Sequence, residues 1–257
     1  MKRIILILTL CAVAAMAQTP TAERNKPSAR DAAIDGQAAA ALNKMTGFVR
    51  GLTIFTVTSE ASRDEIVDTD MKIQKNATTD ISVRLPSRLH ADLHGDDHDL
   101  QFIYDGQTLT LFSARQNYYA TTPAPPTVSR TLDAIRARHG IQFPLADLIQ
   151  MTTGENLLQD MTRAGYIGTS RIDGVECDHV AIRQPEVDWQ VWIERSDTPV
   201  PRKLVITSKS QPTQPQYIAH LTWDFAPSID NNLFVFTPPP DAVRIKFASR
   251  SITGSKQ

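Results

Sequence analysis

The chain alternates between apolar and polar positions over much of its length, and this period of two predicts β-strands. β-branched and aromatic residues occupy many of the apolar positions, as is typical of strands. Together with intervening turn residues, the pattern predicts ten strands, at 53–58, 71–84, 87–93, 100–104, 108–113, 165–172, 175–183, 187–195, 200–209 and 216–225. Two further short strands are expected near Phe234 and Ile245.

Two Asp-Gly pairs indicate tight β-hairpins. Asp105-Gly106 and Asp173-Gly174 each stand between two predicted strands. Both residue types accept the positive φ that tight hairpin turns require. The strands on either side of each pair are therefore expected to be antiparallel neighbours.

Helical periodicity is found in two parts of the chain. Near the N-terminus, Asp35 is expected to cap a helix that carries an apolar stripe from Leu42 onward. In the middle, Ser129–His139 begins with capping hydroxyl residues and ends before a glycine. A second mid-chain helix is expected over Pro144–Met151, and a further turn around 155–162.

The alternating strands predict a sheet with one apolar and one polar face. Three helices cover only part of such a sheet, and a sheet of about ten strands tends to curl. The expected fold is mainly β (α+β): a strongly curved antiparallel sheet of about ten strands, forming a half-barrel, with an N-terminal helix and a mid-chain helical lid. The side chains expected to line its apolar interior are Phe55, Val57, Phe102, Tyr104, Leu109, Leu111, Trp189, Val191, Ile193, Leu204, Ile206, Leu221, Trp223 and Phe225.

Residues 1–17 have the form of a secretory signal peptide. A positive start precedes an apolar run over 4–14, and Ala15-Met16-Ala17 offers the small residues that signal peptidase requires. Cleavage is expected before Gln18, which makes the protein periplasmic. An uncleaved N-terminal anchor and lipid attachment at Cys11 are the alternatives.

Beyond the signal peptide, the sequence predicts one domain. Residues 18–32 are polar and aperiodic and are expected to form a disordered leader, 33–247 a single domain and 248–257 a tail. After cleavage the chain keeps one cysteine, Cys177, so an intramolecular disulfide is excluded. A chain of this size buries enough surface to fold without covalent cross-links.

Composition narrows the classes of function. The chain has 27 basic residues (Lys and Arg) and 28 acidic residues (Asp and Glu). This balance argues against nucleic acid as a partner, because phosphate binding needs a clustered excess of basic residues. The chain has 11 glycines and 16 prolines. This low glycine content disfavours dinucleotide-binding loops, which are rich in glycine. The apolar run of the signal peptide is too short to span a bilayer stably, so the cleaved protein is not expected to be transmembrane.

The densest group of metal-ligating side chains comprises His90, Asp92, His94, Asp96, Asp97, His98 and Asp99. The first three share one face of a predicted strand, and a turn could return His98 towards them, which would suit a transition metal. No metalloprotease or EF-hand spacing accompanies the group. The preferred interpretation is a solvated hairpin end, and no metal is expected.

No nucleophile is well placed for catalysis. The chain has no Gly-x-Ser-x-Gly elbow. Cys177 and His179 share one face of a predicted strand, but a lone strand cysteine is more often a small buried hydrophobe. A solvated loop is expected to hold the carboxylates Asp64, Glu65, Asp68 and Asp70.

The tryptophans of the predicted strands have two interpretations. On a sheet that faces a cavity they would contact an apolar ligand; otherwise they fill the core between sheet and helices. Trp192 has the opposite parity to Trp189, so at least one of the two must face the polar side or a lid.

The sequence also resembles a known family, in its signal peptide, its first helix and strand, and two further segments. These segments are Phe102-Ile-Tyr-Asp-Gly-Gln-Thr-Leu-Thr-Leu-Phe112 and Trp189-Gln-Val-Trp-Ile-Glu-Arg…Pro201-Arg-Lys-Leu-Val-Ile206. The family consists of predicted periplasmic proteins of unknown function and is similar to the lipoprotein carriers and receptors LolA and LolB and to the stress sensor RseB. The resemblance covers about 33–246 and implies a curved sheet with a helical lid around a cavity for acyl chains. It carries over no catalytic residue.

Residues and resemblance together predict a periplasmic, non-enzymatic protein that binds a lipid or a lipoprotein acyl chain in a half-barrel cavity. The alternative is a cell-envelope sensor or adaptor whose sheet presents a surface to another protein. A metal-dependent hydrolase that uses residues 90–98 is a third hypothesis, with less support because no catalytic motif accompanies it. No cofactor is expected.

Overall fold

The computed structural model describes residues 34–68, 71–153 and 160–247, which all belong to a unit that begins at Ala32. In these ranges the strands are β1 (Ile54–Val67), β2 (Met71–Arg84), β3 (Arg88–Gly95), β4 (Asp99–Tyr104), β5 (Thr108–Ser113), β6 (Tyr118–Pro123), β7 (Arg163–Ile172), β8 (Val175–Arg183), β9 (Val187–Glu194), β10 (Pro201–Ser208), β11 (Gln216–Asp224) and β12 (Val243–Arg244). The helices are α1 (Gly36–Arg50), α2 (Val128–His139), α3 (Ala146–Thr152) and the short 3-10 helix η1 (Asn231–Phe234).

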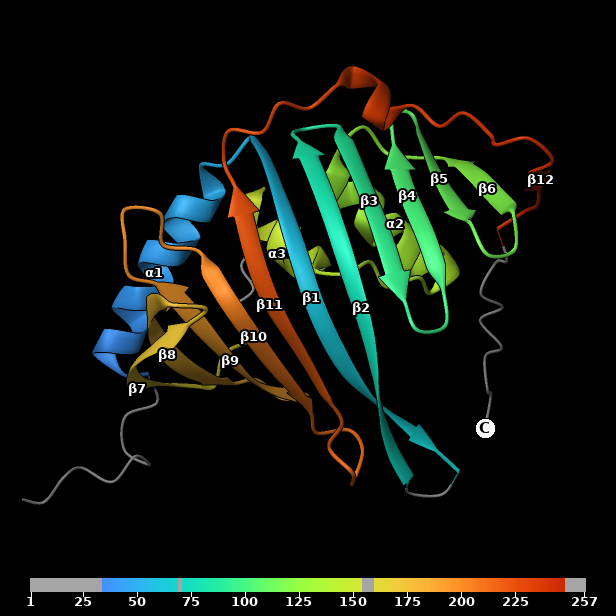
Figure 1. Cartoon of the computed structure of the whole chain (residues 1–257). Coiled ribbons are helices and arrows are strands. Elements are labelled where there is room, and N and C mark those ends of the chain that lie inside the picture. Colours follow the sequence, from blue (N-terminus) through green and yellow to red (C-terminus); the bar gives the residue numbers. More distant parts are fainter. Residues whose placement is uncertain (1–33, 69–70, 154–159, 248–257) are drawn as a thin grey trace, which may run out of the picture. The chain divides into compact units, whose positions relative to one another are not determined.

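All the strands belong to one sheet, in the order β12-β6-β5-β4-β3-β2-β1-β11-β10-β9-β8-β7 (Figure 1). Consecutive strands pair antiparallel in two runs, β1 to β6 and β7 to β11, and the pairing of β1 with β11 joins the runs. β12 adds a short parallel pairing to β6. The sheet has two free edges, at β12 and β7, and does not close into a barrel.

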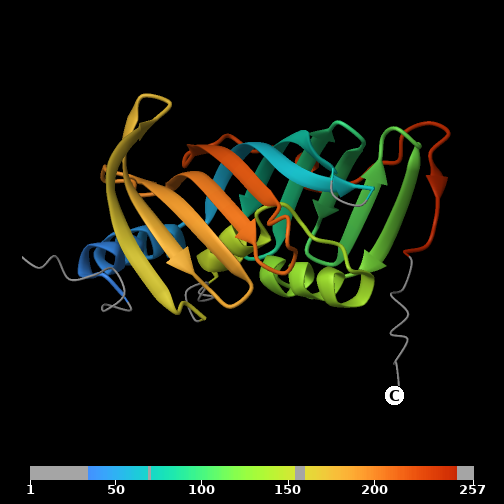
Figure 2. The same cartoon turned by 90° about the horizontal axis from the view of Figure 1, so that it is seen from below.

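The sheet is strongly curved, and the α-helices lie on its concave side (Figure 2). The buried apolar core lies between them, because the inner strand residues and the apolar helix faces meet there. This arrangement confirms the mainly β fold, the curved half-barrel sheet, the N-terminal helix and the helices of the predicted lid.

The first helix forms as its sequence predicts. The Asp35 side chain accepts hydrogen bonds from the backbone amides of Gln37 and Ala38, which would otherwise lack partners. Leu42 and Val49 of its apolar stripe are fully buried in the core between the helix and the sheet. The helix therefore seals the end of the concave face near β7, β8 and β9.

Both Asp-Gly pairs form hairpins, but by different means. Asp173 and Gly174 both have positive φ, 49° and 82°, as the tight two-residue turn requires. In the other hairpin only Gly106 is left-handed, with a φ of 93°. The Asp105 carboxylate instead accepts hydrogen bonds from the backbone amides of Gln107 and Thr108, which closes a three-residue loop.

A long hairpin arm replaces the loop expected around Asp64 and Glu65, so that prediction is wrong. Strands β1 and β2 continue beyond the last residues paired with β11 and β3, and there they pair only with each other. Both faces of this arm border water, so charged residues are tolerated in the strands. Asp64 pairs with Lys72 at 3.1 Å and Glu65 pairs with Lys75 at 3.1 Å across the hairpin. Asp68 lies in the turn, and Asp70 is outside the described residues.

Other differences concern short elements. The sequence did not predict β6, and the strand expected near Phe234 is the 3-10 helix η1, in which the Asp230 side chain accepts from the amide of Asn232. The strand expected near Ile245 is the two-residue β12. The signal peptide, the leader at 18–32, the tail at 248–257 and most of the turn around 155–162 lie outside the described residues.

Residues 226–242 form a strap that follows one end of the sheet from β11 to β12 (Figure 1). Phe236 packs on the outer face, with its ring 5.7 Å from that of Phe112 and 5.1 Å from that of Tyr119. Phe234 is 1% exposed and lies beneath the Arg84 guanidinium. The strap thus covers apolar side chains on the convex face of β3 to β6, while the helices cover the concave face.

Candidate functional site

A cavity of about 530 Å³ lies on the concave side, between the lid helices and strands β9, β10 and β11. Its apolar wall combines side chains from α2 and α3 with side chains from the sheet, namely Leu132, Leu148, Met151, Trp189, Val191, Leu204 and Ile206. The site therefore joins two parts of the chain that are far apart in the sequence.

Strand register arranges the sheet side of the cavity in rows. Trp189 is opposite Ile206, which in turn is opposite Tyr217, and Val191 is opposite Leu204. Opposite residues on neighbouring strands point to the same face of a sheet. Each row therefore presents aromatic or aliphatic side chains side by side across the cavity wall.

Polar side chains also line the cavity. The Gln150 amide is 2% exposed, and its nitrogen donates to Asp133 Oδ1 at 2.9 Å, so it is satisfied within the helices. The remaining polar lining groups include one cation and two carboxylates, Arg136, Asp147 and Asp160. Histidine, cysteine, serine and lysine are absent from the described residues that line the cavity. These side chains often act as nucleophiles or general bases, a class that also includes the carboxylates of Asp147 and Asp160.

The fourteen residues expected to line the interior fall into two groups. Four of them, Trp189, Val191, Leu204 and Ile206, line the cavity. The other ten do not line it, and they are Phe55, Val57, Phe102, Tyr104, Leu109, Leu111, Ile193, Leu221, Trp223 and Phe225.

Packed aromatic side chains cover four of those ten positions, Phe55, Phe102, Trp223 and Phe225. Phe48 of α1 packs edge-on against Phe225, with ring centroids 5.4 Å apart. Phe143, which follows α2, packs edge-on against Phe102 at 5.0 Å. Trp223 packs beside Phe55 at 5.7 Å. Most of the concave face is therefore filled core, and the cavity occupies only the part beneath α2 and α3.

Several cavity residues were missed by the sequence analysis. Leu132, Phe143 and Met151 come from the lid side, and Tyr217 comes from β11. Tyr217 could have been found, because it shares its strand parity with Leu221, which was selected. The lid residues have no comparable signal, because helical periodicity shows an apolar face without showing what the face covers.

The histidine-rich segment does not gather around one point. His90 is 8% exposed, and its ring contacts Leu233 O through Nδ1 and Asp92 Oδ2 through Nε2, each at 2.8 Å. His94 instead faces Asp99, with Nδ1 3.3 Å from Oδ1. Each histidine has a carboxylate of its own, and the described residues contain no group of three or more side chains placed to hold a metal ion.

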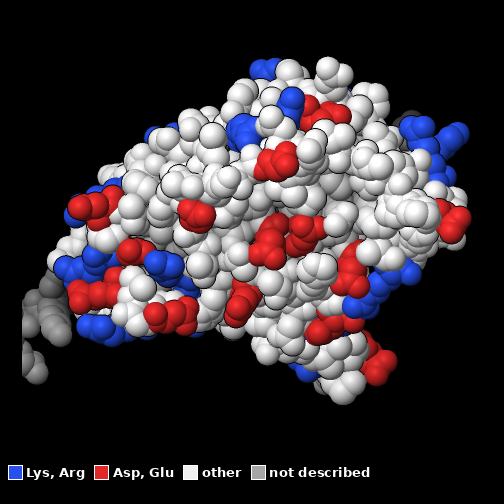
Figure 3. Space-filling view, turned by 45° about the horizontal axis from the view of Figure 1, so that its top comes forward, with Lys and Arg blue, Asp and Glu red and all other residues white. Residues whose placement is uncertain are grey.

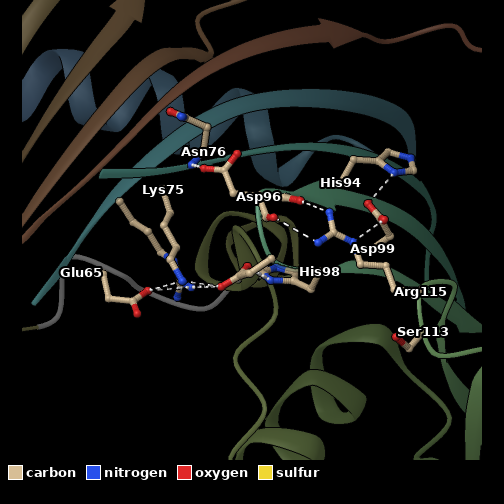
Figure 4. Close-up of polar contacts among 12 residues, drawn as sticks. Glu65, Lys75, Asn76, His94, Asp96, His98, Asp99, Ser113 and Arg115 are labelled. Carbon is tan, nitrogen blue, oxygen red and sulfur yellow. Dashed lines mark hydrogen bonds and ion pairs between the residues drawn. The ribbon is translucent and has the colours of Figure 1, made fainter. Parts of the chain in front are cut away.

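The carboxylates around the β3–β4 turn form ion pairs with Lys75 of β2 and with Arg115 of the turn between β5 and β6 (Figure 4). Arg115 Nε lies 2.8 Å from Asp99 Oδ2, and its other nitrogens donate to the backbone carbonyls of Gly95 and Asp96. Lys75 Nζ lies 2.7 Å from Asp97 Oδ2. That hydrogen bond is the main reason why the pKa of Asp97 is lowered to about 2. The cluster ties the hairpin arm to the β3–β4 turn.

Cys177 and His179 do not form a catalytic pair. The thiol is fully buried, and burial raises its pKa to about 11, which disfavours the nucleophilic thiolate. The His179 ring stacks on Trp192 at 4.0 Å, and its Nε2 contacts Gln190 Oε1 at 2.9 Å. Burial also lowers the pKa of His179. Trp192 therefore lies on the side of the sheet opposite Trp189, as its parity predicts.

The face seen in Figure 3 carries acidic and basic side chains interspersed among neutral ones, and no broad basic surface forms on it. None of the helices in the described ranges is long and apolar enough to cross a membrane.

Comparisons with solved structures find proteins that are similar in fold. The Mycobacterium tuberculosis lipoprotein LppX is 13% identical, with a TM-score of 0.48 over 76% of this chain and 100% of that chain. An uncharacterized conserved protein from Thermus thermophilus is 10% identical, with a TM-score of 0.46 over 82% and 99%. A LolA superfamily protein from Nitrosomonas europaea is 9% identical, with a TM-score of 0.35 over 77% and 97%. Similarities of this size carry no argument about ligands.

Comparison with curated proteins gives no match. A family model does match, over residues 38–248, and its description is "Predicted periplasmic protein (DUF2092)". The match covers most of the chain, and it confirms both the resemblance and the periplasmic localisation predicted from the sequence. The protein belongs to the DUF2092 family of predicted periplasmic proteins.

Proposed function

We propose that this protein binds an apolar chain, from a lipid or a lipoprotein, in the cavity between the sheet and the lid helices, and that it does so without catalysis. The observation that carries the proposal is the cavity itself. Its volume of about 530 Å³ lies within the usual range of small-molecule sites, and its wall is largely apolar.

The cavity wall keeps apolar surface that the fold does not cover. Leu204 and Ile206 are only half-buried although they lie on the concave face, where their neighbours Val191 and Leu221 are fully buried. Apolar surface in a concave site is stabilised by an apolar ligand, because burial removes it from water. Each ligand methylene buried there contributes about 0.8 kcal/mol.

The contribution per methylene sets the order of magnitude of the affinity. Burying about ten to fourteen methylenes gives roughly 8–11 kcal/mol, from which association subtracts at least about 4 kcal/mol. The remainder of roughly 4–7 kcal/mol corresponds to dissociation constants from about 1 mM down to about 10 μM. Tighter binding would require polar contacts in addition to the acyl chain.

The composition of the lining supports binding rather than catalysis. A hydrolase needs a nucleophile or a general base within reach of its substrate. The polar groups of the described lining residues are carboxylates, amides, the Arg136 guanidinium and the Tyr217 hydroxyl. A carboxylate can act as a general base, but no described serine, cysteine, histidine or lysine lines the cavity beside Asp147 and Asp160.

The test is saturable binding of a fluorescent fatty-acid probe, with a matched pair of variants on one strand. Ile206→Trp adds bulk inside the cavity and is expected to weaken probe binding at least about tenfold. Thr207→Trp adds the same side chain at the next residue, which faces the other side of the sheet, and should leave binding unchanged.

Circular dichroism and denaturation serve as controls that both variants are folded. Equal probe affinity in wild type and both variants would refute the proposal, as would the absence of saturable binding to the wild type. Native mass spectrometry of protein purified from periplasm, followed by lipid extraction, then identifies the ligand carried in the cell.

A further inference from the structure

The cavity between the sheet and the lid helices has an apolar interior and a charged mouth. Its described apolar lining residues are buried or half-buried, whereas the exposed ones among the described lining residues are Arg136, Gln142, Asp147 and Asp160. Each of these four carries a charge or an amide. The ligand that fits this division is an amphiphile, with its chain inside the cavity and its polar head at the mouth, where solvent remains.

The two lid helices bring Arg136 and Asp147 to the same side of the mouth. A hydrogen bond joins the helices, from Nε2 of the buried Gln150 in α3 to Asp133 Oδ1 in α2, at 2.9 Å. Arg136 lies three residues after Asp133, and Asp147 lies three residues before Gln150. Residues three apart are neighbours on one helix face. Both charged residues therefore lie one turn from the hydrogen bond, towards the segment 140–145 that connects the helices.

The charges of the mouth are only partly balanced within the protein. Arg136 Nη2 donates to Asp133 Oδ1 at 3.1 Å, and the guanidinium has no other hydrogen bond or ion pair among the described residues. A guanidinium has five N–H groups, so most of its donors are available to an anion. The carboxylates of Asp147 and Asp160 have neither a hydrogen bond nor an ion pair with a described residue. The mouth thus offers available guanidinium donors together with carboxylates that lack a cation.

We propose that the ligand is a zwitterionic phospholipid, whose phosphate accepts hydrogen bonds from Arg136 and whose ammonium group pairs with Asp147. The proposal rests on the proposed function and names its ligand class, a lipid rather than a lipoprotein. Arginine suits phosphate because its planar donors can bind two oxygens at once. A fatty acid would leave the carboxylates at the mouth without a cation, and a cationic amphiphile would leave the Arg136 donors without an anion.

The test compares three ligands with the same single acyl chain as competitors of the fluorescent probe. Lysophosphatidylethanolamine carries phosphate and ammonium, lysophosphatidylglycerol carries the phosphate without a cation, and monoacylglycerol carries neither. Wild type is expected to bind the ethanolamine lipid roughly two- to fivefold more tightly than the glycerol phospholipid, the gain of one solvent-exposed ion pair. In about 1 M salt, where the Debye length is about 3 Å, this preference should disappear.

Two variants that remove one charge each locate the contacts. Arg136→Gln should weaken both phospholipids by roughly two- to fivefold and leave monoacylglycerol binding unchanged. Asp147→Asn should weaken the ethanolamine lipid alone. Arg138→Gln is the matched control, because it removes an exposed charge from the same helix outside the cavity lining, and it should leave all three affinities unchanged. The three substituted side chains are exposed, so the fold should be retained.

The outcomes separate this proposal from the proposed function. Equal wild-type affinity for the two phospholipids, a preference that persists at high salt, or equal effects of Arg136→Gln on all three ligands would each overturn the zwitterionic head group while leaving an apolar-chain site intact. Failure of all three ligands to displace the probe would instead contradict the proposed function.

Discussion

The aromatic contact between Phe143 and Phe102 is expected to anchor the helical lid to the sheet. The two rings meet edge to face, with centroids 5.0 Å apart at 78°, and the residues are 6% and 3% exposed. Phe143 comes from the segment between α2 and α3, while Phe102 belongs to β4. The contact therefore joins the lid to the run of strands that lies away from the cavity.

The magnitude follows from what Phe143 touches. Replacing a buried phenylalanine with alanine usually costs about 3–5 kcal/mol. Phe143 also lines the cavity, so part of its ring has no packing partner to lose. Phe143→Ala is therefore expected to lower the free energy of unfolding by about 3 kcal/mol, of which about 0.5–1.5 kcal/mol is the edge-to-face contact with Phe102.

A double-mutant cycle in urea measures this contact. Phe143→Ala, Phe102→Leu and the double variant should show a coupling energy of about 0.5–1.5 kcal/mol. Phe236→Ala removes a ring from the strap on the opposite face, and with Phe102→Leu it should be additive within about 0.3–0.5 kcal/mol. Additive behaviour of the Phe102 and Phe143 variants would refute the anchoring role.

Three further predictions concern other parts of the chain. The Cys177 thiol, with a pKa raised to about 11 by burial, should not react with a disulfide reagent at about pH 8 until denaturant is added; rapid reaction of the folded protein would contradict this. The hydrogen bond from His90 lowers the pKa of Asp92 below its usual 3.8. The ionised Asp92 side chain therefore stabilises the folded protein above pH 3.8, and this stabilisation is lost as the pH falls from 3.8 through the lowered pKa. Between about pH 5 and pH 2, urea denaturation should therefore show a smaller loss of unfolding free energy for Asp92→Asn than for wild type. Equal pH dependence of the unfolding free energy in both proteins would exclude a stabilising role of the Asp92 carboxylate. Intact-mass measurement of exported protein should give an N-terminus at or within a few residues of Gln18, whereas a full-length species in the membrane fraction would contradict cleavage.

The sequence predicts most of the sheet because strand signals are local. Asp35 caps α1 as expected, and Gly174 forms its turn as expected. The arm at Asp64 was missed because charged residues normally indicate a loop, while in a two-stranded arm both faces border water and cross-strand ion pairs support the strand. β6 was missed because Tyr118–Pro123 lacks a clear alternation of apolar and polar positions and ends in proline.

The site was harder to predict than the fold. Strand parity identifies which side chains share the concave face, and so it selects Ile206 and Phe102 alike. It does not show where along the face the helices pack closely, which is set by contacts such as that of Phe143 with Phe102. The charged mouth of the cavity is equally invisible in the sequence, because it depends on how α2 and α3 pack against each other and the sheet.

The pairing of β1 with β11 also has a consequence for folding kinetics. Nearly every other strand pairing joins neighbours in the sequence, so β1 to β6 and β7 to β11 are two meanders that close short loops as they form. The β1–β11 pairing, which includes Thr56 opposite Asp224, must instead close a loop of most of the domain. Contacts between residues so distant in sequence form slowly because their entropic cost comes before their energetic gain. We therefore expect the two meanders to form early and the seam between β1 and β11 to set the rate at which the complete concave face, and with it the cavity, is assembled.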